Sequence, residues 1–213
     1  MLTYSVPLRA RFRGITVREG MVWRGAAGWA EFAPFDDYID ADAVPWLKAA
    51  VEAADVGWPE PVRDSVPVNC MVPAVDPDQA HELVRAGHGC RTAKVKVAEP
   101  RQSLDEDITR VEAVRDAIGP DGRVRVDANG AWDVDEAVRA VRLLDRAAGG
   151  LEYVEQPCGT VEELAQLRRR IDVPVAADES IRRATDPYRV RELEAADIAV
   201  LKVAPLGGVR ACL

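Results

Sequence analysis

The segment Thr92-Ala93-Lys94-Val95-Lys96-Val97 has the composition of a short apolar strand that carries two lysines, and the rest of the chain is organised around it. Alternate side chains of a strand point to opposite faces, so Lys94 and Lys96 share one face and the apolar residues share the other. Two neighbouring ammonium groups repel each other unless negative groups lie opposite. The stretch therefore predicts a buried strand whose polar face lies beside carboxylates.

The chain around this strand alternates between strands and helices from about residue 66 onward. Strands are expected at 66–75, 92–97, 123–127, 151–155, 173–178 and 198–203, with helices near 76–86, 104–118, 133–146, 161–170 and 186–194. This alternation is typical of parallel βα architecture. The sequence predicts an α/β fold, a TIM-like (β/α) barrel domain over residues 66–213 in which about six βα units are present.

Residues 1–65 have a different pattern and are expected to form a separate α+β domain. Strands are predicted at 2–8, 17–23 and 28–32, and a helix at 42–54. Strands followed by a helix indicate a small α+β unit. Trp58-Pro59-Glu60-Pro61 is typical of a linker between this domain and the barrel.

Charged residues stand at or near the ends of five successive predicted strands: Lys96, Asp127, Glu155, Asp178 and Lys202. Active sites of βα barrels form at the carboxyl ends of the strands, from residues on several strands. Three converging carboxylates repel one another, and a divalent cation resolves that repulsion. Their hard oxygen atoms favour Mg²⁺.

Each of these residues also has an ordinary structural explanation when it is taken alone. A lysine at a strand end is often a solvated edge charge, Asp178 could cap the next helix, and Glu155-Gln156-Pro157 could be a turn. Because five successive predicted strands each end in or near such a residue, a shared site is favoured. Burying them unpaired would be costly, which also indicates that they face one another.

The motifs at these strand ends resemble those of the enolase superfamily, in its muconate-lactonizing subgroup. They are Lys94-x-Lys96, Asp127-Ala128-Asn129, Glu155-Gln156-Pro157, Asp178-Glu179-Ser180 and Leu201-Lys202-x-x-x-x-Gly207-Gly208. The N-terminal domain resembles that family's capping domain. Within the subgroup, Arg11-Phe12-Arg13-Gly14-Ile15 and Val154-Glu155-Gln156-Pro157-Cys158 resemble the dehydratases of menaquinone biosynthesis.

The resemblance implies a role for each residue of these motifs. Asp127, Glu155 and Asp178 would bind Mg²⁺, with Mn²⁺ as a substitute, and the metal would hold a small-molecule carboxylate substrate. Lys96 would remove the α-proton and return it to the departing hydroxide, with Lys94 beside it and Lys202 stabilising the intermediate. The resemblance further implies that Arg13, Asn129, Ser180, Gly207 and Gly208 help to bind the substrate, although Arg13 could equally be a solvated loop charge.

Several other functions remain open at this stage. The same site would serve an N-succinylamino acid racemase, a dipeptide epimerase or a cycloisomerase, because all of them begin with proton abstraction. A Schiff-base aldolase would use Lys202 or Lys96 as a nucleophile and would leave the carboxylates without a role. An inactive, truncated chain is the remaining alternative.

Length and composition limit these alternatives further. The formal net charge of −8 argues against nucleic acid as a partner, and no apolar run predicts membrane insertion. The four cysteines form no C-x-x-C pair, and together with the lack of a signal-peptide pattern they indicate a cytoplasmic protein. A closed barrel takes about 250 residues, so the natural chain is expected to continue beyond Leu213. The oligomeric state is left open.

Overall fold

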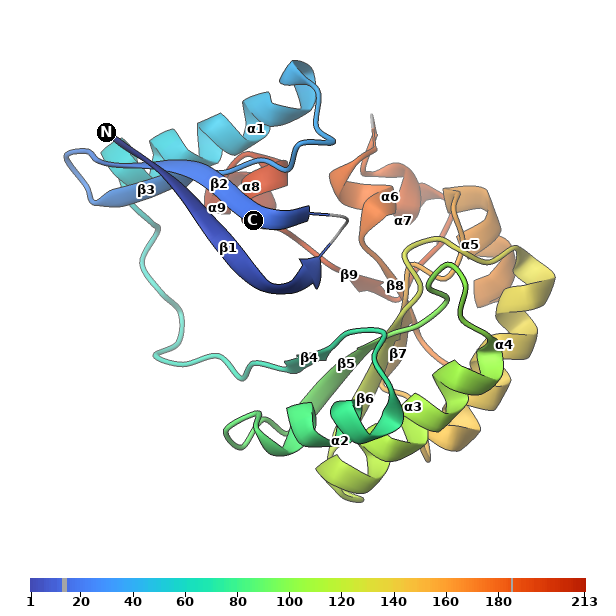
Figure 1. Cartoon of the computed structure of the whole chain (residues 1–213). Coiled ribbons are helices and arrows are strands. Elements are labelled where there is room, and N and C mark those ends of the chain that lie inside the picture. The colour runs from blue at the N-terminus through green and yellow to red at the C-terminus, as the bar shows by residue number, and fades with distance from the viewer. Residues whose placement is uncertain (13–14, 185) are drawn as a thin grey trace. The chain divides into compact units, whose positions relative to one another are not determined.

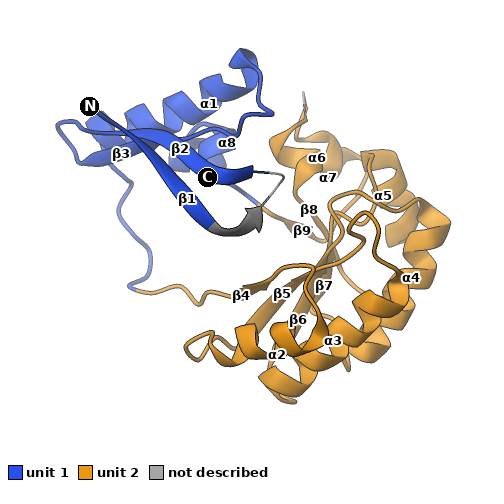
Figure 2. Ribbon diagram, in the orientation of Figure 1, with its two compact units in different colours: residues 1–64, 201–213 blue, residues 65–200 orange. Residues whose placement is uncertain are grey.

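The computed structural model describes residues 1–12, 15–184 and 186–213. The chain divides into two compact units (Figure 1, Figure 2), one made of residues 1–64 and 201–213 and the other of residues 65–200. The sequence assigned residues 201–213 to the barrel domain, whereas the structure groups them with the N-terminal residues. No helix among the described residues has both the length and the apolar composition needed to cross a bilayer.

The first unit contains a three-stranded antiparallel sheet in the order β1-β2-β3. Its elements are β1 (Leu2–Phe12), β2 (Ile15–Arg24), β3 (Trp29–Phe32), α1 (Asp40–Val51) and the π-helical turn η1 (Glu52–Val56). The core of this unit is built from small residues, Ala30, Ala50, Ala53 and Ala54, against which Trp23 and Phe32 pack. The predicted α+β arrangement of strands followed by a helix is confirmed.

The C-terminal segment joins the first unit through contacts with α1 and with η1. Its helices are α8 (Val203–Leu206), which lies against α1, and α9 (Val209–Cys212). The Glu52 carboxylate accepts hydrogen bonds from the Val209 N–H at 2.6 Å and from the Arg210 guanidinium at 2.8 Å. These partners are more than 150 residues apart in the sequence, and for that reason the strand–helix pattern did not reveal the association.

The second unit is a parallel sheet whose six described strands follow one another in sequence order. They are β4 (Cys70–Val72), β5 (Thr92–Lys96), β6 (Arg123–Asp127), β7 (Tyr153–Glu155), β8 (Val175–Ala177) and β9 (Ile198–Ala199). Every neighbouring pair is parallel. The predicted βα succession is therefore confirmed.

Helices follow the strands and cover one face of this sheet, as Figure 1 shows. They are α2 (Pro77–Arg85), α3 (Leu104–Ile118), α4 (Val134–Ala147) and α5 (Val161–Arg168). Capping boxes begin three of them, in which Ser103, Asp133 and Thr160 each pair with a glutamate three residues later. Small and branched apolar residues of the helices bury their inner faces against the strands.

The elements at the margins of the second unit differ from the sequence prediction. The expected strand at 66–75 is limited to β4, because residues 66–68 are exposed and remain outside the sheet. The expected helix at 186–194 is the short α7 (Arg189–Glu192), and an additional turn, α6 (Glu179–Arg182), directly follows β8. The strand expected at 198–203 ends at Ala199, so Lys202 follows the strand at a distance.

Candidate active site

Strand β5 has the alternation that the Lys94-x-Lys96 pattern predicted. Ala93 and Val95 are completely buried on one face of the strand, while Lys94 and Lys96 lie on the other face and are partly buried. The apolar face packs toward the helical layer because β-branched and small residues fit that side of a covered sheet. The two ammonium groups are thereby directed away from the helices.

The pairing of the strands brings charged residues side by side. In the parallel register, Lys96 lies opposite Asp127 on β6, and Asp127 in turn lies opposite Glu155 on β7. These three residues are the last ones of their strands. The predicted convergence at the carboxyl end of the sheet is thus present for β5, β6 and β7.

The side chains at this edge form one connected cluster of charges. Lys94 Nζ lies 2.8 Å from each oxygen of Glu155 and 3.2 Å from Asp127 Oδ2. Lys96 Nζ lies 2.7 Å from the same Asp127 oxygen. Asp127 is 1% exposed and Glu155 is 0% exposed, so solvent screens these interactions very little.

Burial and the neighbouring charges change the pKa values in this cluster. Burial alone would raise the pKa of Asp127, but the ammonium groups of Lys96 and Lys94 outweigh it and hold that pKa below its ordinary value. For Glu155, burial and the negative charge of Asp127 raise the pKa despite the opposing charge of Lys94. The pKa of Lys94 is lowered by burial, yet Glu155 and Asp127 more than compensate and raise it.

Asp178 lies just beyond β8 and has a different partner. Its Oδ1 accepts a hydrogen bond of 2.9 Å from Arg182 Nε, within the turn α6. Asp178 is 1% exposed, and its negative charge contributes to the raised pKa of Glu155. Arg182 was not among the predicted site residues, although a basic residue four positions after an acidic one on a helical turn is a recognisable signal.

Gln156 is a second residue whose role the sequence analysis missed. Its side chain is fully buried, donates to Ser180 Oγ at 2.7 Å, and accepts from the Asp178 N–H at 3.0 Å and the Ser180 N–H at 3.1 Å. Gln156 thereby ties the end of β7 to the segment that carries Asp178. Ser180, predicted to bind substrate, is 7% exposed and serves this network.

Asn129 lies beside the base predicted at Lys96. Its Oδ1 accepts from Lys96 Nζ at 2.5 Å, and its backbone N–H donates to Asp127 Oδ1 at 3.1 Å. Its φ is 48°, a left-handed conformation that asparagine tolerates better than most residues. Asn129 is exposed, so it can both orient Lys96 and contact a ligand.

The chemistry of the donor set fits a divalent cation. Three buried carboxylates stand at adjacent strand ends, and Glu179 Oε2, next to Asp178 in sequence, is a buried oxygen without a hydrogen-bond partner among the described residues. The carboxylates are turned toward lysine and arginine. In that arrangement no group of three Asp, Glu, His or Cys in the described part of the chain closes around a common point. The metal ligands therefore stay a prediction.

The other predicted site residues belong to the first unit or lie outside the described residues. Lys202 is exposed and precedes α8, and Gly207 and Gly208 follow that helix, so all three belong to the first unit. Gly208 fits closely against Glu52 of the same unit. Arg13 lies outside the described residues. A role for these residues beside Lys96 remains a prediction.

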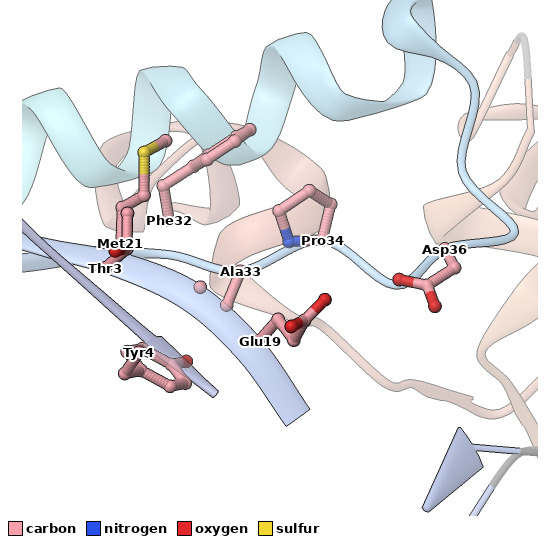
Figure 3. Close-up of a pocket in the computed structure, with 9 residues that line it drawn as sticks. Thr3, Tyr4, Glu19, Met21, Phe32, Ala33, Pro34 and Asp36 are labelled. Carbon is pink, nitrogen blue, oxygen red and sulfur yellow. The ribbon is translucent and has the colours of Figure 1, made fainter. Parts of the chain in front are cut away.

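A cavity of about 350 Å³ in the first unit is lined by none of the predicted site residues. Figure 3 shows Tyr4, Glu19 and Asp36 among the side chains that line it. The Tyr4 hydroxyl donates to Glu31 at 2.7 Å. The cavity contains carboxylates but none of the lysines of the cluster, so it offers no comparable chemistry.

The fold and the charged strand ends define a class of protein, one that combines a small α+β domain with a parallel βα unit and a lysine–carboxylate cluster at its carboxyl edge. Residues 77–213 match the family described as enolase C-terminal domain-like, and residues 3–54 match the one described as enolase N-terminal domain-like. The chain belongs to the enolase superfamily. The resemblance drawn from the motifs is thereby confirmed, as are a capping domain and a partial barrel.

Relatives with high sequence identity share one name. The o-succinylbenzoate synthase of Thermobifida fusca is 67% identical over 210 residues, which cover 99% of this chain and 65% of that protein. The o-succinylbenzoate synthase of Mycolicibacterium smegmatis is 58% identical over 205 residues, or 96% of this chain and 63% of that protein. The chain thus spans less than two thirds of the length of these relatives.

Solved structures share the fold at much lower identity. The L-Ala-D/L-Glu epimerase of Bacillus subtilis superposes with a TM-score of 0.81 at 24% identity, covering 99% of this chain and 75% of the epimerase. The o-succinylbenzoate synthase of Thermosynechococcus elongatus, solved with Mg in its active site, has a TM-score of 0.71 at 23% identity and covers 99% and 78%. Both comparisons concern the fold.

Proposed function

We propose that this chain carries the catalytic groups of an o-succinylbenzoate synthase, a metal-dependent dehydratase of menaquinone biosynthesis. The observation that carries the proposal is the contact of Lys96 Nζ with Asp127 at 2.7 Å, next to Lys94 and Glu155. A lysine held at the edge of a carboxylate cluster suits removal of a proton next to a carboxylate group. The names of the two similar relatives support the same substrate.

The substrate in this proposal is 2-succinyl-6-hydroxy-2,4-cyclohexadiene-1-carboxylate. Neutral Lys96 accepts the α-proton, and the electron pair of the broken C–H bond moves toward the substrate carboxylate. The pair then forms the new ring double bond as the C–O bond breaks. The hydroxide leaves on the same face and takes the proton back from Lys96 as water. The ring becomes aromatic, so this second step is strongly favourable.

The remaining groups support that sequence of steps. Asp127, Glu155 and Asp178 would hold Mg²⁺, with Mn²⁺ as a substitute because it accepts the same oxygen ligands. When bound, the metal supplies positive charge that neutralises the substrate carboxylate as the proton leaves. Lys94 and Lys202 are proposed to stabilise the same developing charge, and Arg13, Gly207 and Gly208 to contact the substrate. Asn129 holds Lys96, and Gln156 with Ser180 holds Asp178.

The proposed location in the cytoplasm is supported by the state of the cysteines. The structure has free thiols at Cys70, Cys90, Cys158 and Cys212, which suit the reducing cytoplasm. Burial raises the pKa of the Cys158 thiol to about 12, so this cysteine is unreactive. The proposed ligand is a small carboxylate.

The test is a dehydratase assay of the purified protein with and without Mg²⁺. Lys96→Ala is expected to lower kcat by about 10²–10⁴-fold, the usual contribution of a general base. Lys48→Ala, which removes an exposed lysine of α1, is the matched control and should leave kcat within about twofold. Equal activity of Lys96→Ala and Lys48→Ala would contradict the proposal. Turnover of succinylamino acids or dipeptides in place of the cyclohexadiene would contradict its substrate.

A further inference from the structure

Helix α3 contains an ion pair that is almost completely buried. Asp107 is 2% exposed and Arg110 is 1% exposed, and Arg110 Nη1 lies 2.6 Å from Asp107 Oδ1. A buried charge is costly unless it is paired and its hydrogen-bonding groups are satisfied. The remaining hydrogen-bonding atoms of Asp107 and Arg110 therefore need partners, and those partners show which part of the structure the pair holds in place.

Arg110 connects α3 to the ends of two neighbouring strands. Its Nη1 donates to the backbone carbonyl of Lys96 at 3.0 Å, and its Nε donates to the carbonyl of Val75 at 2.7 Å, beyond the end of β4. Its Nη2 donates to the side chain of Gln102 at 2.5 Å, and Gln102 in turn donates to the carbonyl of Ala74 at 3.1 Å. One guanidinium thus fixes the carboxyl edge at β4 and β5.

Asp107 holds the backbone two residues beyond Lys96. Its Oδ2 accepts a hydrogen bond of 2.8 Å from the Ala98 N–H. Ala98 has a φ of 59°, in the left-handed region that residues with a Cβ rarely adopt. A conformation of this kind persists where the surrounding structure fixes it. The buried pair therefore holds the chain on the carboxyl side of Lys96 in a specific and strained path.

We propose that Asp107 and Arg110 are positioning residues that direct Lys96 Nζ toward Asp127 and Asn129. The inference rests on the proposed function, because it takes Lys96 as the base. Arg110 holds the Lys96 carbonyl, Asp107 holds the Ala98 amide, and the side chain between them ends 2.7 Å from Asp127 and 2.5 Å from Asn129. A reacting group displaced by about 1 Å can lose about 10²-fold in rate, so fixing this backbone matters for catalysis.

The same helix offers a matched control nearer its C-terminal end. Arg115 also donates to several backbone carbonyls, those of Ala148, of Gly119 at 2.7 Å and of Gly122 at 2.8 Å. These carbonyls lie in the connections that lead into β6 and β7, on the amino side of the sheet. A role in general stability would be shared by Arg110 and Arg115. Of the two arginines, only Arg110 contacts the backbone of Lys96, so a role in positioning Lys96 would not be shared by Arg115.

The experiment compares Arg110→Lys with Arg115→Lys. Lysine keeps the positive charge beside Asp107 and so favours folding, but it lacks the planar fork that reaches several carbonyls at once. Arg110→Lys is expected to lower kcat by about 10-fold to 100-fold with KM within about twofold. Arg115→Lys should leave both parameters within about twofold. Equal effects of the two substitutions on kcat would overturn the inference.

A second measurement tests the inference without turnover, so that it can be separated from a failure of the proposed function. Reductive methylation followed by peptide mass spectrometry gives the reactivity of Lys96 relative to exposed Lys48. Arg110→Lys should change that ratio at least about threefold, and Arg115→Lys should not. If the unsubstituted protein has no dehydratase activity, the proposed function fails, and this ratio alone decides the inference. An unchanged ratio in Arg110→Lys overturns it.

A milder substitution covers the case in which Arg110→Lys does not fold. Gln102→Ala leaves the buried ion pair intact and removes only the link between Arg110 and the Ala74 carbonyl. It is expected to change kcat and the methylation ratio in the same direction as Arg110→Lys, by about two- to fivefold, with KM unchanged. Wild-type values of both quantities in a folded Gln102→Ala protein would count against the positioning role.

Discussion

The two ends of the parallel sheet in the second unit carry similar charged groups in different surroundings. At the carboxyl end, buried Glu155 contacts Lys94, and the cluster excludes most solvent. At the amino end, the Glu152 carboxylate forms ion pairs with Arg125 at 2.5 Å and with Arg123 at 2.8 Å. The Glu152 side chain is 23% exposed. Burial, rather than the number of ion pairs, therefore distinguishes the candidate active site from an ordinary charged edge.

The comparison can be tested first by removing one carboxylate from each end. Glu155→Ala leaves the partly buried ammonium of Lys94 with Asp127 as its remaining partner at 3.2 Å, and should lower the free energy of unfolding by about 3–5 kcal/mol. Glu152→Ala removes a solvent-screened partner and should lower it by about 0–1 kcal/mol. Urea denaturation followed by circular dichroism measures both. Similar losses would show that burial does not separate the two ends.

Addition of Mg²⁺ should sharpen the same contrast. A ligand that binds only the folded protein stabilises it by about 2.7 kcal/mol at a free concentration of 100 times its Kd. We expect Mg²⁺ to stabilise the unsubstituted protein and Glu152→Gln alike, whereas Glu155→Gln, which removes a proposed ligand, should lose this effect. Thermal unfolding with and without Mg²⁺ gives the comparison. Equal stabilisation of both variants would remove Glu155 from the ligand set.

Much of the carboxyl end could be predicted from the sequence because its signals are local. The Lys94-x-Lys96 alternation predicted the polar face of β5. The charged residues at the ends of 123–127 and 151–155 predicted which side chains lie beside that face. Parallel pairing then brought these strand ends together. A pattern within each strand and a rule about strand pairing are therefore sufficient to predict which charged side chains lie together.

The contacts that the sequence did not reveal join residues far apart along the chain. Arg110 looks like any basic residue of an amphipathic helix, and its burial follows from the Val75 carbonyl, 35 positions away. Residues 201–213 follow the barrel pattern, yet Glu52 binds Val209 from 157 positions away. Neither association has a periodic signal. The assignment of Asp178 to the same cluster was less direct, because Arg182 is its observed partner.

Backbone strain also differs between the loop that follows β5 and the C-terminal end of α3, and it should produce smaller effects. Gly119 has φ 79° and ψ 173°, a region essentially restricted to glycine, and a Cβ there would meet open space. Gly119→Ala should therefore destabilise by about 1–3 kcal/mol through the backbone alone. Ala98 has a φ of 59°, so Ala98→Gly should stabilise by about 0.5–1 kcal/mol. Urea denaturation would detect both, and stabilisation by Gly119→Ala would contradict this explanation.

The smallest expected effect is the pH dependence at the amino end. Burial would raise the pKa of Glu152, but hydrogen bonds from Arg125 and Arg123 outweigh it and lower that pKa. Since the folded protein has the lower pKa, the ionised carboxylate stabilises the fold at pH values above the unfolded pKa of about 4.3. That contribution is lost as the pH falls through the folded pKa. Because the group is partly exposed, it amounts to less than about 1 kcal/mol.

Glu152→Gln tests this directly, because glutamine has a similar shape and does not titrate. The difference in unfolding free energy between the unsubstituted protein and the variant should be constant from pH 7 to about 5 and should shrink toward pH 3. Urea midpoints across this range measure the difference. A difference that is independent of pH would mean that the arginines hold Glu152 by shape and hydrogen bonding alone. The charge of Glu152 would then contribute nothing to stability, in contrast to the charges expected to matter among the buried groups at the carboxyl end.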